Sequence, residues 1–367
     1  MYRRVAGVGL ALTMLVAGCG HSSSTSQGPA TSSTPVPSVA TSSTRAASAT
    51  SQAARDLPDP HTLRGLTEVP ELPDPKPVEG SSAQKLPVTV TDVEGNKVTI
   101  KSTSRILALD LYGTLSRTLI GLGLGDKIVG RTVSSTEKQL HDRPVVTENG
   151  HVLNVEAVAG LKPSVIIADR SVGPKEALDQ LRKSGIPVVL VDPHRSVGST
   201  PQLIRTIADA VGKPDAGEAL VKRTQEQIDQ AKKQIAAWKP AKPMRVAFLY
   251  VRGNAGVFFI LGSENGANEL IQGVGADDVA SDKGITTLVP ANAESLVSIN
   301  PDAIFVMRDG LASTGGMKGL LARAGVANTT AGRKQRVISI PDGISLSFGP
   351  QTGEVLTAVA KALYGVK

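Results

Sequence analysis

A tyrosine and an arginine two residues apart are the residues in this sequence best suited to binding a metal. Tyr250 ends the apolar run 246–250, and Arg252 follows it. Residues i and i+2 of an extended segment point to the same side, so we expect the guanidinium beside the phenol oxygen. A fixed positive charge favours the phenolate over the phenol, and a phenolate is a hard anionic ligand suited to ferric iron. Alternatively, a tyrosine at a strand end serves packing alone.

A histidine in the first half of the chain offers a second ligand. His151 lies in the loop 148–153, just before a helix that we expect to begin after Asn154. A lone loop histidine is most often only solvated. Histidine and tyrosine are both axial ligands of haem iron, however. His151 and Tyr250 would hold one iron from two sides if the fold brought them face to face.

Two runs of alternating strands and helices are expected to position these residues. The alternation indicates βα units on parallel sheets, and ligands of such sheets gather beyond the carboxyl ends of the strands. The expected strands are 106–109, 128–129, 165–168 and 188–191 in the first run, and 246–250, 258–260, 303–306 and 337–340 in the second. A hairpin, 88–91 with 97–100, precedes them. Between the runs, the pattern of residues 215–238 predicts one helix about 36 Å long, which ends before Pro240 and Pro243.

The two halves repeat each other. The pattern Asn-x-Glu, then Pro-x-x-Ile, begins at Asn154 and returns at Asn292, 138 residues later. Segment 119–126 resembles 270–277 in the same order. We therefore predict an α/β protein with two similar lobes on parallel sheets joined by one long rigid helix. The expected boundaries are 86–214 for the N-terminal lobe, 215–239 for the helix and 240–367 for the C-terminal lobe.

The N-terminus predicts export. Two arginines and a short apolar run read as a secretory signal peptide over residues 1–18. The run 5–18 is shorter than the ~20 residues that span a bilayer, although an uncleaved anchor with an idle cysteine is the alternative. Small residues before Cys19, the only cysteine, look like a lipobox, which implies that Cys19 is acylated. Residues 19–85 are rich in Ser, Thr and Pro, so we expect a disordered tether that holds the protein at the outer face of the membrane.

Composition excludes several classes. A single cysteine allows no disulfide within the chain. The net charge of +7 is not accompanied by a basic segment with interleaved aromatic residues, so we expect no nucleic-acid partner. We find neither a serine nucleophile elbow nor a Walker loop. The five histidines are too scattered for a three-histidine zinc site.

The lobes, connecting helix, lipobox and tether together resemble the solute-binding lipoproteins of ABC importers, in the group that delivers siderophores, cobalamin and haem. The resemblance covers about 88–367. It implies that Glu156 and Glu294, one per lobe, dock onto arginines of a permease dimer served by a cytoplasmic ATPase. The alternative for this motif is helix capping, because Asn154 and Asn292 are good N-caps and a glutamate in the first turn favours the helix dipole.

A narrower resemblance is to the haem-binding lipoproteins of actinobacterial haem importers, which use a histidine of the first lobe, a tyrosine of the second and an arginine two residues beyond it. It implies a monomer without enzymatic activity that carries ferric haem (ferric protoporphyrin IX), taken from cell-surface haem proteins, between axial ligands His151 and Tyr250. Arg252 would support the tyrosine. Further pocket candidates are Tyr112, Met307 and, for the propionates, Arg131 and Arg308.

Three other functions stay open at this point. The same fold could carry a ferric siderophore or cobalamin. A chelatase-type enzyme that inserts or removes the metal of a tetrapyrrole is a second alternative, against which export and a lipid anchor argue. The third is an adhesion or scaffold lipoprotein.

Overall fold

The computed structural model describes residues 57–79, 83–253 and 256–367. The chain divides into two units, 1–46 and 47–367, and all the described residues belong to the second. The predicted signal peptide 1–18, Cys19 and most of the predicted tether lie outside the described residues. Across the described ranges, no helix combines the length and the apolar character that crossing a membrane requires.

The N-terminal lobe is built on a parallel sheet in the order β5-β4-β8-β9. Alternate residues of the buried strands face two separate cores. One core holds α2 (Thr114–Gly121), α5 (Thr200–Ala210) and the predicted hairpin, and the other holds α3 (Val155–Gly160) and α4 (Lys175–Lys183). Covering on both faces explains why these strands are apolar throughout. The strands are β4 (Ile106–Leu109), β5 (Ile128–Gly130), β8 (Val165–Ala168) and β9 (Val188–Leu190), and the hairpin is β2 (Val88–Thr91) with β3 (Lys97–Ile100).

The C-terminal lobe has a mixed sheet in the order β1-β15-β14-β10-β11-β13, with β12 (Asp277–Asp278) also paired to β10. Strands β1, β15, β14, β10 and β12 are parallel, but β11 and β13 are antiparallel to their neighbours. The expectation of a parallel sheet is therefore wrong for segment 258–260. The few residues between β10 and β11 allow a hairpin and are too short for a parallel crossover. The bounds are β10 (Arg245–Arg252), β11 (Val257–Ile260), β13 (Val289–Pro290), β14 (Ala303–Met307) and β15 (Val337–Ile340).

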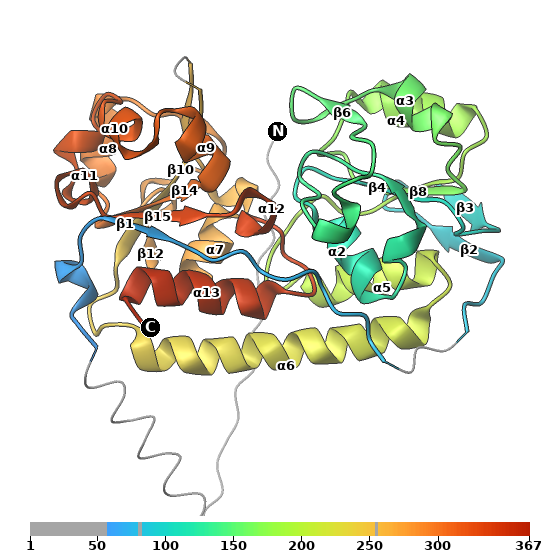
Figure 1. Ribbon diagram of the computed structural model, residues 1–367, viewed down its shortest axis with the longest axis horizontal. Helices are drawn as coiled ribbons and strands as arrows, with labels where there is room; N and C mark the ends of the chain where they lie inside the picture. The colour runs from blue at the N-terminus through green and yellow to red at the C-terminus, as the bar shows by residue number, and fades with distance from the viewer. Residues whose placement is uncertain (1–56, 80–82, 254–255) are drawn as a thin grey trace, which may run out of the picture. The chain divides into compact units, whose positions relative to one another are not determined.

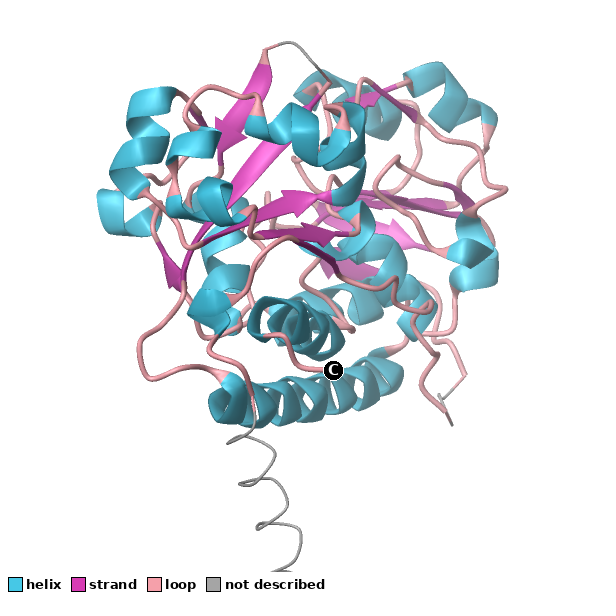
Figure 2. Ribbon diagram, turned by 60° about the vertical axis from the view of Figure 1, so that its left-hand side comes forward, coloured by secondary structure: helices cyan, strands magenta, loops and turns pink. Residues whose placement is uncertain are grey.

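Helices cover both faces of this sheet (Figure 2). Phe248 and Phe305 pack edge to face, with ring centroids 6.4 Å apart, in a core shared with α7 (Ala267–Gly273) and α13 (Thr352–Tyr364). The opposite core holds α8 (Ala293–Ile299), α9 (Arg308–Ser313), α10 (Gly316–Leu321) and α11 (Thr330–Lys334). Two α/β lobes confirm the predicted fold class.

One helix, α6 (Pro214–Trp238, 25 residues), runs beneath both lobes in Figure 1. Leu220 and Val221 belong to a core of the N-terminal lobe, and Ala231 and Ile235 to a core of the C-terminal lobe. Each end of the helix is thus buried in a different lobe. This arrangement opposes large changes in the angle between the lobes.

Residues 57–79, which we call the strap, cross from one lobe to the other ahead of the predicted boundary at 86. Within them β1 (Leu66–Glu68) pairs in parallel with β15. Further along, Val78 N donates to Gly121 O of α2 at 2.9 Å. The prediction of a disordered tether over 19–85 is therefore wrong for residues 57–79. Its poverty in large apolar residues suggested disorder, but an edge strand is held mainly by backbone hydrogen bonds, which composition does not reveal.

Candidate functional site

Tyr250 and Arg252 lie at the carboxyl edge of the C-terminal sheet. Leu249 is in register with Val306, and Met307 with Ile340, so the ends of β10, β14 and β15 meet at one level. The guanidinium carbon of Arg252 lies 5.3 Å from the centroid of the Tyr250 ring. The two side chains therefore share one side of β10, as their spacing predicts, with the guanidinium over the ring face.

A carboxylate that was not predicted from the sequence holds this arginine. Arg252 Nη2 donates to Asp342 Oδ1 at 2.5 Å, and its distance to Met307 Sδ is 3.5 Å. Burial disfavours the charged guanidinium, but Asp342 and the neighbouring Tyr250 outweigh it, so the pKa of Arg252 is raised. Asp342 follows β15 at the same carboxyl edge. Its position just after a predicted strand is the sequence signal from which Asp342 could have been predicted.

His151 lies at the tip of a hairpin on the N-terminal lobe, β6 (Thr147–Glu148) with β7 (Val152–Leu153). Its backbone carbonyl accepts from Gly173 N at 2.9 Å, which ties the hairpin to the turn after β8. In Figure 1 the hairpin lies on the side of this lobe nearer the other lobe. The imidazole is exposed and forms no hydrogen bond or ion pair with any residue that the structure describes. The structure brings Tyr250, Arg252 and Met307 together, and it records no contact between His151 and these three.

Tyr112 bridges the lobes from the N-terminal side. It is partly buried and packs against the C-terminal core that Tyr250 and Met307 also contact. The guanidinium carbon of Arg195 lies 5.6 Å from the centroid of its ring. Burial, and after it the charge of Asp169, raise the pKa of the Tyr112 phenol.

Beneath Tyr112 lies a buried charged cluster at the ends of β4 and β8. Arg195 donates to Asp169 and lies 3.9 Å from Asp110 Oδ2. Burial and the neighbouring Asp169 raise the pKa of Asp110 to about 7. Burial likewise raises the pKa of Asp169. None of the candidate residues predicted from the sequence belongs to the charged group of this cluster, although both aspartates directly follow predicted strands.

The predicted docking residues and propionate partners form none of the contacts that join Tyr250, Arg252 and Met307. Glu156 in α3 and Glu294 in α8 are exposed, one on each lobe. The asparagines before them cap their helices, with side chains accepting from Ala157 N and Ser295 N. Arg308 is bound by the strap through Glu71 and Val69 O, which disfavours it as a propionate partner. Among the described residues, the Arg131 side chain forms hydrogen bonds only to two carbonyls of its own lobe, both at 3.4 Å.

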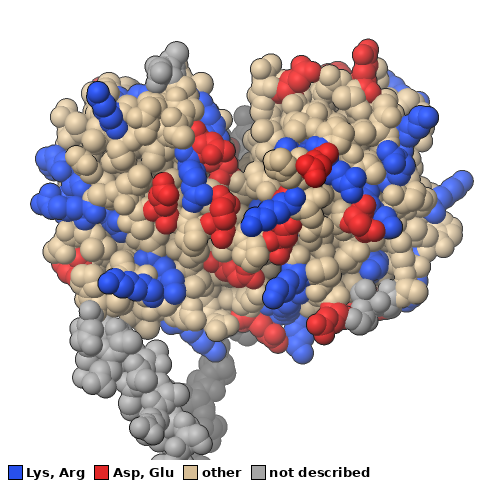
Figure 3. All heavy atoms as spheres, viewed as in Figure 1, with Lys and Arg blue, Asp and Glu red and all other residues tan. Residues whose placement is uncertain are grey.

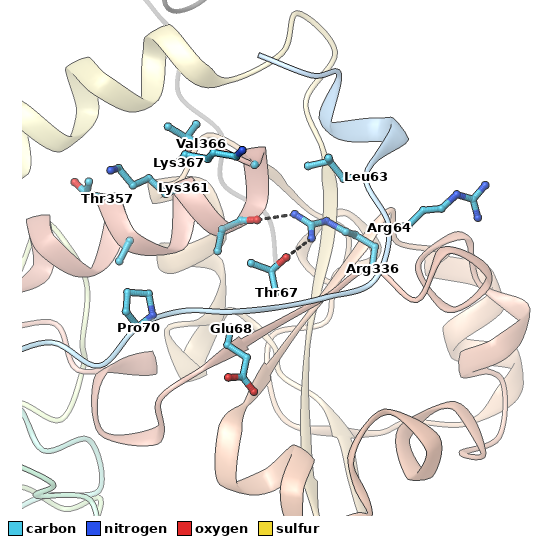
Figure 4. A pocket seen from close by; sticks show the side chains of 13 residues that line it. Leu63, Arg64, Thr67, Glu68, Pro70, Arg336, Thr357, Lys361, Val366 and Lys367 are labelled. Atoms are coloured by element: carbon cyan, nitrogen blue, oxygen red, sulfur yellow. Dashed lines mark hydrogen bonds between the residues drawn. The ribbon is translucent and has the colours of Figure 1, made fainter. Parts of the chain in front are cut away.

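A cavity of about 530 Å³ lies elsewhere, between the strap and α13 (Figure 4). The buried Arg336 reaches into this region and donates to Thr67 Oγ1 and to the carbonyls of Ala362 and Leu363. These are last-turn carbonyls of α13, which need such donors. Burial lowers the pKa of Arg336 to about 10. The cavity contains none of the predicted ligands, and its arginine has a structural role.

The known proteins described below, which are similar to this chain, are all binding proteins. The family described as "Periplasmic binding protein" matches residues 111–343. YvrC of Bacillus subtilis (strain 168), an uncharacterized ABC transporter substrate-binding lipoprotein, is 27% identical over 280 residues, which are 76% of this chain and 86% of YvrC. A cobalamin-binding protein of Halobacterium salinarum is 24% identical over 80% of this chain and 78% of its own length.

Among solved structures, the heme binding protein HmuT superposes with a TM-score of 0.83 at 49% identity, over 84% of this chain and all of HmuT. HmuT has also been solved with a histidine, a tyrosine or an arginine replaced by alanine. These relatives are binding proteins and not enzymes, in agreement with the prediction for this chain. Because the family match covers more than half of the chain, this protein belongs to the periplasmic binding protein family of ABC transporters.

Proposed function

We propose that this protein binds ferric haem outside the cell, between its two lobes, and delivers it to the permease of an ABC importer. Tyr250 supplies an anionic oxygen ligand, His151 supplies a nitrogen ligand from the opposite lobe, and Arg252 favours the phenolate. Tyr112 and Met307 offer apolar surface to the porphyrin. Nothing in this role requires a covalent change in the ligand.

One observation carries this proposal. In HmuT the substituted histidine and tyrosine are 99 positions apart, and the substituted arginine follows two positions later. His151, Tyr250 and Arg252 have the same spacing. The geometry supports it independently, because Arg252 stacks on Tyr250 at the carboxyl edge of the sheet and the His151 imidazole is uncommitted.

An absorption titration of the purified protein with haemin tests the proposal. We expect a shifted Soret band that saturates at a fixed stoichiometry, together with a tyrosinate-to-iron charge-transfer band. The variant Tyr250→Phe keeps the ring under Arg252 and removes only the oxygen, so it is the matched control and should lose the charge-transfer band. A haemin spectrum unchanged by the protein would refute haem binding.

Cobalamin is the second candidate, because a cobalamin-binding relative aligns over 80% of this chain. Competition distinguishes the two. Excess cyanocobalamin should leave haem binding unchanged if haem is the ligand. Displacement of haem, or tight cobalamin binding that Tyr250→Phe does not affect, would favour cobalamin.

Delivery requires docking and anchoring. Glu156 and Glu294 are exposed first-turn carboxylates, one per lobe, and suit pairing with arginines on the two halves of a permease dimer. Acylated Cys19 would hold the protein at the outer face of the cytoplasmic membrane. Metabolic labelling with a fatty acid, compared between the wild-type protein and Cys19→Ala, tests the anchor.

A further inference from the structure

The turn after β15 touches both the arginine beside Tyr250 and the opposite lobe. Helix α12 (Asp342–Ser345) begins with Asp342, which accepts from Arg252 through Oδ1 and from Asp309 N at 2.8 Å through Oδ2. The carbonyl of the next residue, Gly343, accepts from Arg117 Nε at 3.2 Å. Arg117 belongs to α2 of the N-terminal lobe. The support of the Tyr250 site and a bond between the lobes therefore lie on adjacent residues.

The contact between the lobes at this turn is buried and close. A Cβ atom at Gly343 would meet Thr136 Oγ1 of the other lobe at 1.9 Å, so any larger residue there would force Thr136 to shift. Arg117 also donates to Gln351 Oε1 at 2.8 Å, and it lies 3.7 Å from the fully buried Glu137. Buried charged hydrogen bonds are costly to leave unmade. With the lobes together, Arg117 thus fixes where the turn lies.

Space exists beside the turn for it to move. A cavity of about 230 Å³ is lined by the turn residues Pro341 to Gly343, by residues of both lobes and by the strap. Its walls carry carboxylates and cations in similar numbers, and acidic and basic side chains intermingle where the lobes meet on the face shown in Figure 3. A polar cavity of this size admits water when the turn shifts.

We propose that Asp342 is a positioning residue that couples the lobe interface to the tyrosine ligand, a role that rests on the proposed haem binding. With the lobes together, Arg117 holds Gly343, and Asp342 holds Arg252 over Tyr250. When the lobes separate, the turn loses Arg117 and moves, and Asp342 draws Arg252 off the ring. The iron–oxygen bond then opens with its electron pair left on the phenolate, which takes a proton from water.

Haem transfer to excess apomyoglobin measures the release rate. The double variant Arg117→Gln/Glu137→Gln removes the lobe contact without leaving a buried unpaired charge, and we expect release about tenfold faster. Asp342→Asn should have a similar effect. The matched control is Arg105→Gln, which removes an arginine that donates to Leu161 O within one lobe, and release should match the wild type.

A double-mutant cycle separates this coupling from simple loosening of the lobes. In an Arg252→Leu background the Arg117 and Glu137 changes should add no further acceleration, because the link through Arg252 is already cut. Full additivity would overturn the proposal. If the double variant does not fold, Arg117→Lys keeps a charge near Glu137 but presents one nitrogen in place of the fork, and the same expectation applies.

The two proposals fail in different ways. A wild-type protein that binds no haemin refutes the proposed function itself. A wild-type protein that binds haemin, with Arg117 and Asp342 variants that release it no faster than Arg105→Gln, refutes only the coupling.

Discussion

Removing the positive charge beside Tyr250 should weaken ferric haem binding. At the 5.3 Å separation of the Arg252 guanidinium carbon from the ring centroid, two unit charges interact by ~3 kcal/mol at an effective dielectric constant of about 20. The Arg252 side chain is 32% exposed and paired with Asp342. Solvent screening and this pairing reduce the interaction to ~1.4 kcal/mol, which corresponds to about a tenfold change in the dissociation constant.

The assay is a titration of the protein with haemin at constant pH, followed by the tyrosinate-to-iron band. In Arg252→Leu the anionic oxygen ligand loses its stabilising cation, and the freed Asp342 carboxylate repels it. The dissociation constant for haemin should therefore rise about tenfold. Arg252→Lys keeps the charge without the fork and should give an intermediate dissociation constant. Equal dissociation constants in the wild type and Arg252→Leu would refute the electrostatic reasoning.

Three further predictions address the ligands, the docking surface and a buried acid. Tyr250→Ala should weaken ferric haem binding more than His151→Ala, because an anionic oxygen holds ferric iron more tightly than a neutral imidazole; titrations with haemin would rank them, and equal or reversed losses contradict this. Glu156→Ala and Glu294→Ala should leave haemin affinity unchanged and impair haem uptake by cells, so lost affinity would contradict a docking role. Because the pKa of Asp110 is raised to about 7, the folded protein retains a proton that an unfolded carboxyl of pKa about 3.9 releases. The stability that this proton contributes is complete below about pH 4 and is lost as pH rises through about 7. In Asp110→Asn the free energy of unfolding, measured by urea denaturation, should therefore depend less on pH between these values.

Features of the site that depend on local pattern could be read from the sequence. Uninterrupted apolar residues predict the buried strands β4, β8 and β14. Residue type predicts the helix caps Asn154 and Asn292. The pair Tyr250 and Arg252 follows from strand periodicity alone. These features are set by residues a few positions apart, whose preferences survive in any tertiary context.

Other features depended on contacts that no local pattern encodes. The pairing of Arg252 with Asp342 joins residues 90 positions apart, and the bond from Arg117 to Gln351 joins residues 234 apart. The strap is ordered because an edge of the C-terminal sheet, more than 250 positions away, accepts β1 as a neighbour. The strap's own composition does not predict this pairing.

The sequence by itself therefore determined the two-lobed α/β class, the long connecting helix and the candidate iron ligands, because hydrophobic periodicity and the strand-end rule act within short segments. Only the tertiary structure decided that Asp342 holds Arg252 and that Arg117 joins the lobes one residue away. The physical reason is that a buried charge is stable only where a partner residue lies within hydrogen-bonding distance in a suitable geometry. The packing of whole helices and strands positions that partner, and this packing is a property of the folded chain.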